Sequence, residues 1–169
     1  DRGSKCAASE GMRPGDWVET AMAGHHDRKA FDCGEPDLNL YLQRYARQNH
    51  QAGGAKCFVV IDRAAPERVL GYYTLSPTEI AHSRAPEIVR RGLARYNVPA
   101  FRLGRLAVDH SVQKRGLGRL LLFGAGERAL MVAAHVGGLA LIIDAKNEAV
   151  AGWYRGFGAV ALDDAPLTL

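Results

Sequence analysis

The fold is most strongly constrained by one part of the sequence. There, a run of alternating residues with branched side chains is followed by closely spaced glycines and a long apolar segment. Residues 102–108 (RLGRLAV) alternate and are rich in branched side chains, which predicts a strand. Residues 116–135 contain no proline and have one broad apolar face, which predicts a helix. Gly116 and Gly118 lie where the two meet, and glycine allows a sharp turn and a close approach of the backbone to a ligand. The sequence therefore predicts a strand–turn–helix unit at this point.

The start of the predicted helix is a candidate anion site. The first N–H groups of a helix have no partner within it and carry the positive end of its dipole, so they favour a phosphate or pyrophosphate. Lys114, Arg115 and Arg119 add positive charge. Glycines before a helix also serve plain turns and tight packing, and both interpretations are open on this pattern alone. The Gly-Lys-Ser/Thr of a P-loop and the full dinucleotide fingerprint are not present.

The rest of the chain interleaves strands and helices. Such an order is typical of an α/β domain with a mixed central sheet flanked by helices. Residues 63–68 are expected to form a turn, and Ser76-Pro77 to end the strand before it. The further strands are expected at 16–23, 55–62, 69–75 and 139–145, with the start of another at 160–162, and the helices at 36–50, 87–94 and 147–157. We expect one domain over 13–169, preceded by a disordered extension or tag remnant at 1–12.

Composition limits the function classes. With 169 residues and 47% hydrophobic content, the chain can bury one core, and its net charge of +4 suits polyanions such as RNA without requiring them. No run is long enough to cross a bilayer and no signal peptide is evident, so we expect a cytoplasmic chain that does not bind a membrane. Cys6, Cys33 and Cys57 are expected to be free thiols. His25-His26 resembles half a metal site, but no further ligand spacing supports it; we expect surface histidines and no metal.

Two motifs resemble the GNAT acetyltransferases. Residues 106–118 are similar to motif A of that family, whose pattern Gln/Arg-x-x-Gly-x-Gly/Ala is met at Gln113, Gly116 and Gly118. Residues 147–158 resemble the family's helix ending in Tyr-x-x-Phe-Gly-Phe, with Ala159 in the last position. The resemblance implies the GNAT fold, with acetyl-CoA as co-substrate and its pyrophosphate at the glycine turn. It also implies a full strand after the last helix, of which residues 167–169 supply only the beginning, so the far edge of the acceptor pocket is expected to be incomplete.

Further segments resemble one branch of that family. Residues 31–46, 71–76 and 103–109 are similar to the toxins of bacterial toxin–antitoxin pairs, and the resemblance runs from about His26 to the C-terminus. It implies acetylation of the α-amino group of aminoacyl-tRNA, which blocks translation, and a ribbon-helix-helix antitoxin and a homodimer as assemblies. A GNAT enzyme acting on a small-molecule or protein amine is the alternative. A non-catalytic binding module is a third hypothesis, which the retained Tyr154 disfavours.

The resemblance also assigns roles to residues. Tyr154 is expected to protonate the leaving thiolate, since a phenol of ordinary pKa, about 10, is protonated at neutral pH; packing under the sheet is its other interpretation. Asn147 is expected to contact the pantetheine arm, to cap its helix, or both. Backbone N–H groups at 106–108 are expected to stabilise the oxyanion, and water to take the amine proton. The predicted acetyl-CoA site comprises Leu106, Ala107, Val108, Gln113, Lys114, Arg115, Gly116, Leu117, Gly118, Arg119, Asn147 and Tyr154.

Basic residues form the last candidate group. Clusters of arginine bind nucleic-acid phosphates, although solvated surface charge is an equally open interpretation. Asp109 and Asp144 are expected in turns or at strand ends. The predicted tRNA-binding residues are Arg84, Arg90, Arg91 and Arg95, with Arg102 and Arg105 as further members of the basic set.

Overall fold

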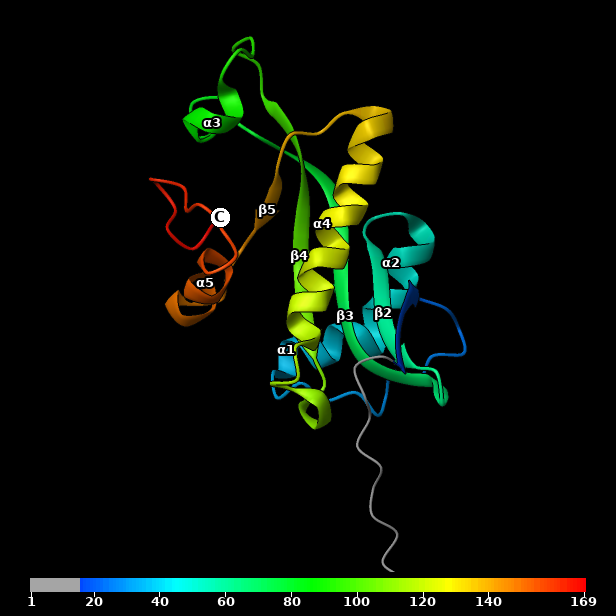
Figure 1. Ribbon diagram of the computed structural model, residues 1–169. Helices are drawn as coiled ribbons and strands as arrows, with labels where there is room; N and C mark the ends of the chain where they lie inside the picture. The colour runs from blue at the N-terminus through cyan, green and yellow to red at the C-terminus, as the bar shows by residue number, and fades with distance from the viewer. Residues whose placement is uncertain (1–15) are drawn as a thin grey trace, which may run out of the picture.

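The computed structural model describes residues 16–169, so the extension predicted at 1–12 lies outside the described residues. A five-stranded sheet forms the centre, and its strands lie side by side in chain order (Figure 1). β1 to β4 pair antiparallel and β5 pairs parallel to β4, so the predicted mixed sheet is confirmed. The strands are β1 (Trp17–Ala21), β2 (Lys56–Asp62), β3 (Ala65–Ile80), β4 (Val98–Val108) and β5 (Leu141–Ile143).

Helices cover both faces of the sheet. On one face lie α1 (Pro36–Leu40), the π-helical turn η2 (Tyr41–Tyr45) and α2 (Ala46–Ala52), which follow one another without a break and fill the range of the predicted 36–50 helix. The long α4 (Leu117–Val136) crosses the other face, as Figure 1 shows. α5 (Glu148–Arg155) lies beyond β5, and the short α3 (Glu87–Arg90) lies at the far tip of β3 and β4 (Figure 1).

The core is divided by the sheet into two layers. Phe58 and Val60 of β2 pack in the cluster that includes α4, whereas Cys57 and Val59 pack in the cluster that includes η2 and α2. Because both faces are covered, residues 57–61 of β2 form a continuous apolar run rather than an alternating one. The thiols of Cys57 and Cys33 are free, as expected, and burial raises the pKa of Cys57 to about 12.

β3 and β4 are longer than predicted. β3 continues through Pro77 to Ile80, so the expectation that Ser76-Pro77 ends this strand is wrong. The pairing of β2 with β3 stops at Lys56 and Leu75, and beyond that point β3 has β4 as its neighbour on one side only. A proline lacks the N–H that a ladder needs, but at such an open edge the missing donor is tolerated. β3 also begins at Ala65, which shortens the predicted turn at 63–68.

The C-terminal segment pairs with β5. No sheet strand forms at 160–162, where the structure has only an isolated bridge between Leu162 and Ala165, so that prediction is wrong. Instead, Ile143 and Leu169 exchange backbone hydrogen bonds of 2.9 and 2.8 Å, and the N–H of Ala145 donates to the carbonyl of Leu167 at 2.7 Å. Residues 167–169 therefore add the beginning of a further strand beside β5.

One of the paired histidines is buried. His26 is 4% exposed and its Nδ1 accepts a hydrogen bond from the N–H of Ala23 at 3.0 Å, so the expected surface position is wrong for His26 and correct for His25. Burial, with a smaller contribution from His25, lowers the pKa of His26. Within residues 16–169, no group of three or more His, Cys, Asp or Glu side chains is placed to hold a metal ion. Nor does any helix of that range have the length and apolarity to span a lipid bilayer.

A charged network attaches α4 to β1 and β3. Arg128 donates to Glu19 at 2.7 Å and to the hydroxyl of Tyr73 at 3.1 Å, and that hydroxyl donates to Glu19 at 2.8 Å. We expect Arg128→Met to lower the free energy of unfolding by about 1–3 kcal/mol, because it leaves the mostly buried Glu19 carboxylate without its cation. Urea denaturation measures this loss. Arg91→Met is the matched control: its ion pair with Glu87 is exposed, and the expected change is within about 0.5 kcal/mol. Equal effects would contradict a structural role for the network.

Candidate active site

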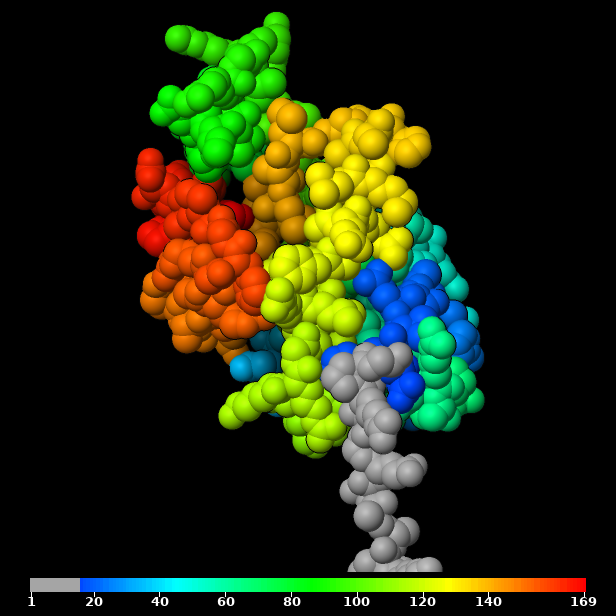
Figure 2. Space-filling model, in the orientation of Figure 1, coloured from blue at the N-terminus to red at the C-terminus, as the bar shows by residue number. Residues whose placement is uncertain are grey.

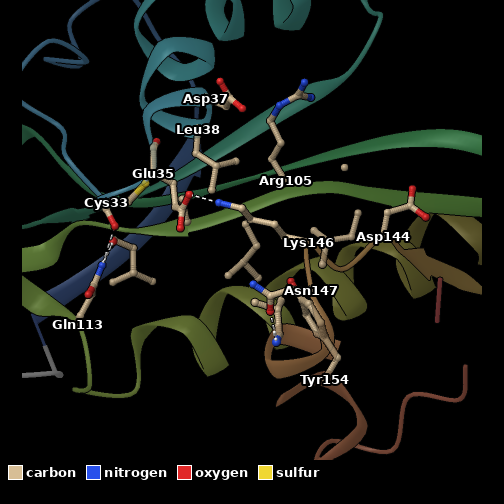
Figure 3. A pocket seen from close by; sticks show the side chains of 16 residues that line it. Cys33, Glu35, Asp37, Leu38, Arg105, Gln113, Asp144, Lys146, Asn147 and Tyr154 are labelled. Carbon is tan, nitrogen blue, oxygen red and sulfur yellow. Dashed lines mark hydrogen bonds and ion pairs between the residues drawn. The ribbon is translucent and has the colours of Figure 1, made fainter. Parts of the chain in front are cut away.

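β4 and β5 separate after a short stretch of pairing. The two strands pair only from Phe101 to Leu103, after which β4 runs on to Val108 while the other chain turns into α5. Gly104 is a bulge, since Leu103 and Arg105 oppose successive residues of β3. A cavity of about 510 Å³ fills the opening, with residues 103–108 of β4 on one side and 144–147 on the other (Figure 3). Within the described chain, the β5-facing edge of 104–108 pairs with no strand, so main-chain groups other than the carbonyl of Val108, which accepts from Gln113, are available to a ligand.

A second cavity continues the first toward α4. It has a volume of about 740 Å³ and is lined by residues from the start of α4, the end of β4 and the inner face of α5. The two cavities share several lining residues, and these form one cleft between the first turn of α4 and the opening of the sheet. The shared residues are Leu106, Val108, Gln113, Val150 and Tyr154.

The first turn of α4 is an uncapped helix N-terminus that follows a glycine turn, as the sequence predicted, and the binding of an anion there stays a prediction. Gly116 precedes the helix with a φ of 88°, a left-handed conformation that favours glycine, and no side chain caps the helix there. The first helical donor with a carbonyl partner is Leu120, which donates to Gly116 at 3.2 Å. The N–H groups of Leu117, Gly118 and Arg119 therefore have no acceptor within the helix. They lie beside a cleft that also contacts Lys114 and Arg119.

Tyr154 lies where the two cavities meet. It is 6% exposed, belongs to the main core cluster and lines both cavities. Burial raises the pKa of Tyr154 to about 12, because the phenolate would lose its hydration. The group is therefore a phenol at neutral pH, the form required of a general acid. The packing that the sequence offered as one interpretation of Tyr154 is observed, and the residue also lines the cleft; its role as the catalytic acid stays a prediction.

Asn147 caps α5. Its side-chain oxygen accepts a hydrogen bond from the N–H of Val150 at 3.0 Å, which confirms the capping interpretation. The residue also lines the 510 Å³ cavity, close to Tyr154 in Figure 3. A contact with the pantetheine arm stays a prediction.

Gln113 and Asp109 fix the turn that leads into the cradle. The side-chain nitrogen of Gln113 donates to the carbonyl of Val108 at 2.9 Å and to that of Cys33 at 3.0 Å, a contact visible in Figure 3. Asp109, at the strand end as expected and 4% exposed, accepts from the N–H of Asp32 at 3.0 Å and from the hydroxyl of Ser111 at 2.5 Å. The amide nitrogen of Gln113 is thus occupied by the protein, and its predicted pyrophosphate contact stays untested.

Other predicted residues contribute differently or lie elsewhere. The side chain of Leu117 is buried in the core, which leaves its N–H as the group that a ligand can reach. Arg115 is exposed and lines neither cavity. Arg102 pairs with Asp144, and Arg105 lines the cavity with its guanidinium 3.7 Å from the ring centroid of Tyr41.

The four predicted tRNA-binding arginines lie away from the cleft. Arg84, Arg90, Arg91 and Arg95 all belong to the segment around α3, which projects from the end of the molecule opposite to the start of α4 (Figures 1 and 2). Arg84 pairs with Asp164 at 2.6 Å and Arg91 with Glu87 at 3.7 Å. The four arginines thus lie on one projecting segment, and two of them form ion pairs with acidic residues.

The sequence did not predict the residues that line the far wall of the cleft. Lys146 forms an ion pair with Glu35 across the 510 Å³ cavity, as Figure 3 shows, and this pair joins segments that are 111 positions apart. No local pattern distinguishes these residues from ordinary surface charge. The further lining residues that were not among the predicted site residues are Cys33, Asp37, Leu38, Leu103, Gly104, Ala149, Val150 and Trp153.

Known proteins share this architecture. No family model matches the chain. The tRNA-acetylating toxin of Mycobacterium tuberculosis (strain H37Rv) is 39% identical over 131 residues, which cover 78% of this chain and 76% of that protein. The structure of AtaT complexed with acetyl-methionyl-tRNAfMet superposes with a TM-score of 0.85 at 29% identity, over 91% of this chain and 93% of the other. A tyrosine-to-phenylalanine mutant of AtaT, bound to the C-terminus of the antitoxin AtaR and to acetyl-CoA, superposes with a TM-score of 0.77 at 27% identity, over 91% of each chain.

The GNAT resemblance, the mixed sheet with its opening and the relationship to these toxins agree with one another. This chain therefore belongs to the GNAT-fold acetyltransferase toxins.

Proposed function

We propose that this chain transfers the acetyl group of acetyl-CoA to the α-amino group of aminoacyl-tRNA and thereby blocks translation. One observation supports this most strongly: a single cleft connects an uncapped helix N-terminus to a protonated, buried Tyr154 at the opening of the sheet. A diphosphate-bearing thioester needs an anion site at one end and an acid at the other. The relationship to a tRNA-acetylating toxin supports the choice of acceptor.

Successive parts of the cleft are suited to successive parts of acetyl-CoA. The N–H groups of Leu117, Gly118 and Arg119 are placed to receive the pyrophosphate, with Lys114 adding charge. The pantetheine arm would then follow the free edge of β4 at 106–108, where main-chain groups can pair with its amides. This direction brings the thioester to Tyr154. AtaT, whose structure this chain resembles, has been solved with acetyl-CoA.

The transfer requires no covalent enzyme intermediate. The neutral amine of the acceptor attacks the thioester carbonyl; the new C–N bond forms, and the C–S bond breaks when the tetrahedral centre collapses. The backbone N–H groups at 106–108 are the expected donors to the transient oxyanion. Tyr154 gives its proton to the departing thiolate, and water takes the proton released by the amine. Tyr154 then regains a proton from solvent.

The acceptor would enter through the 510 Å³ opening. Lys146 and Glu35 face each other there, so the acceptor end meets both charges before it reaches Tyr154. Aminoacyl-tRNA and acetyl-CoA share the cytoplasm, which supports that localisation. An antitoxin is the expected partner, since AtaT has been solved with the C-terminus of its antitoxin, and the family resemblance implies the ribbon-helix-helix type. A homodimer stays a prediction.

The acceptor class can be tested directly. We expect radiolabelled acetyl-CoA, mixed with the protein and charged tRNA, to label the aminoacyl group; base hydrolysis should release N-acetyl amino acid. Uncharged tRNA and free amino acids serve as controls and should stay unlabelled. Labelling of free amino acids, polyamines or a protein amine, with charged tRNA unlabelled, would instead establish the alternative GNAT enzyme.

A further inference from the structure

One ion pair spans the opening of the 510 Å³ cavity. Lys146 lies between β5 and α5, and its ammonium group donates to the carboxylate of Glu35, which directly precedes α1. Figure 3 shows the two side chains reaching toward each other across the opening. We call Lys146 and Glu35 the clasp. Both residues line the cavity that also contains Tyr154, so a molecule that enters from this side contacts the clasp on its way to the acid.

The backbone on each side of the clasp is held in place, whereas the two side chains are free to exchange partners. The carbonyl of Glu35 accepts from the N–H of Asn39 at 3.0 Å, and Lys146 directly precedes Asn147, which caps α5. The side chains are 63% exposed for Lys146 and 46% for Glu35, and the Glu35 carboxylate does not cap α1 although it stands at the N-cap position. Exposed ion pairs contribute little to stability, so a ligand can replace each partner at small cost.

The charges of the clasp favour one class of acceptor. When the pair separates, the carboxylate and the ammonium group each gain from a new partner of opposite sign. A simple amine or a protein N-terminus offers a partner to Glu35 alone, and it leaves Lys146 without an anion in a cavity that Arg105 also lines. The 3′ end of an aminoacyl-tRNA carries both groups: an α-amino group, which is partly an ammonium ion at neutral pH, and a phosphodiester beside the terminal nucleoside.

We propose that the clasp selects the acceptor by exchanging partners, so that Glu35 receives the α-amino group and Lys146 the phosphodiester beside the terminal nucleoside. This rests on the proposed function, in which aminoacyl-tRNA is the acceptor. Both residues position the acceptor and take no part in proton transfer, so they act on KM for the acceptor and not on kcat. Acetyl-CoA reaches Tyr154 from the start of α4, and its binding does not depend on the clasp.

The first experiment measures the acetylation of charged tRNA by variants of the clasp. We expect Glu35→Gln and Lys146→Met each to raise KM for charged tRNA roughly 3- to 30-fold, the loss of a charge-assisted hydrogen bond that is partly exposed to water. The kcat, and the Kd for acetyl-CoA by calorimetry, should stay near those of the wild type. Glu148→Gln and Arg155→Met are the matched controls: they break an exposed ion pair on α5 whose members line neither cavity, and KM should not change.

A charge swap distinguishes recognition of the acceptor from a structural role of the pair. In the double variant Glu35→Lys/Lys146→Glu, the ion pair can form again with its polarity reversed. A pair that only holds the two segments together would be restored, and KM would return to the wild-type value, which would overturn the proposal. We expect KM instead to stay raised at least as far as in the single variants, because each charge of the acceptor then meets a charge of the same sign. A thermal melt verifies that the double variant is folded.

The second experiment assigns the phosphodiester to Lys146. Puromycin is an aminoacyl nucleoside with a free α-amino group and no phosphate, and cytidylyl-puromycin adds one phosphodiester to it. As competitive inhibitors of tRNA acetylation by the wild type, cytidylyl-puromycin should bind more tightly than puromycin. Lys146→Met should abolish this difference, and Glu35→Gln should weaken both inhibitors. Equal inhibition of the wild type by the two compounds, or a difference that persists in Lys146→Met, would refute the role of Lys146.

The outcomes separate this proposal from the proposed function. If the wild type acetylates charged tRNA and the clasp variants match its KM, the clasp is not a recognition element and the proposed function stands. If the wild type leaves charged tRNA unacetylated and acetylates another amine, the proposed function itself fails. Weaker acetyl-CoA binding in the clasp variants would mean that the pair shapes the whole cleft, which contradicts a role confined to the acceptor.

Discussion

Tyr154→Phe is expected to lower kcat for acetyl transfer by roughly 100- to 10,000-fold, the usual contribution of a general acid. The change removes the hydroxyl and keeps the ring, which packs in the core at 6% exposure. Thermal stability and the Kd for acetyl-CoA should therefore stay near those of the wild type. Single-turnover acetylation of charged tRNA measures the rate, and calorimetry the Kd.

A matched variant distinguishes the acid from an ordinary buried phenol. Tyr72 is also buried, and its pKa is also raised by burial, but it lines neither cavity and donates to the carbonyl of Leu38 at 2.8 Å. Tyr72→Phe should cost stability of about 1 kcal/mol and leave kcat unchanged. Wild-type turnover in Tyr154→Phe would remove Tyr154 from the mechanism.

The pH profile gives an independent measure of the same group. Because burial raises the pKa of Tyr154 to about 12, its proton is retained well above the ordinary pKa of tyrosine. The acid form is therefore still present between about pH 8 and 10, and kcat/KM should not fall there through its loss. A decline with an apparent pKa near about 10 would mean that the hydroxyl is hydrated like a free phenol.

The sequence predicted features that depend on neighbours along the chain. The turn before α4 could be predicted because a sharp turn often needs a left-handed residue and glycine adopts that conformation most readily, as Gly116 does with a φ of 88°. The cap of α5 could be predicted because Asn147 is a preferred N-cap residue directly before a helical pattern. The order of strands and helices followed from periodicity, and the resemblance of residues 147–158 to the family's Tyr-x-x-Phe-Gly-Phe helix singled out Tyr154.

Features that depend on the assembled sheet were not predictable. Pro77 was expected to end its strand, since no local signal shows that the pairing of β3 with β2 stops at Leu75 and leaves an open edge. The π-helical turn at Tyr41–Tyr45 interrupts a segment that has an ordinary helical pattern. The contact of Lys146 with Glu35 exists only because β5 and the segment before α1 meet across the opening. The surface position predicted for His26 was wrong because the residues next to it in the sequence do not indicate that its polar ring is buried.

Gly118→Asp is expected to weaken the binding of acetyl-CoA strongly without lowering the thermal stability of the protein. Gly118 is the second residue of α4, and a Cβ there would lie 3.5 Å from Trp153, an ordinary contact. Loss of a helical glycine and a negative charge at the helix N-terminus each stabilise by about 0.3–1 kcal/mol, so the melting temperature should stay level or rise. The carboxylate, however, would occupy the position of the pyrophosphate. Two like charges about 4 Å apart repel by about 1 kcal/mol in water and by about 4 kcal/mol near a protein surface. We therefore expect calorimetry to give a Kd for acetyl-CoA that is roughly 10- to 1,000-fold higher than that of the wild type.

Two further variants isolate the charge. Gly118→Asn has the same size as Gly118→Asp and no charge, so the difference between their Kd values measures the repulsion. Gly126→Asp places the same carboxylate in open space farther along α4, and acetyl-CoA affinity should match the wild type there. Equal losses in Gly118→Asn and Gly118→Asp would mean that volume alone excludes the donor. Wild-type affinity in Gly118→Asp would mean that the diphosphate binds elsewhere, because a full negative charge among the N–H groups of Leu117, Gly118 and Arg119 cannot be neutral toward a dianion in contact with them.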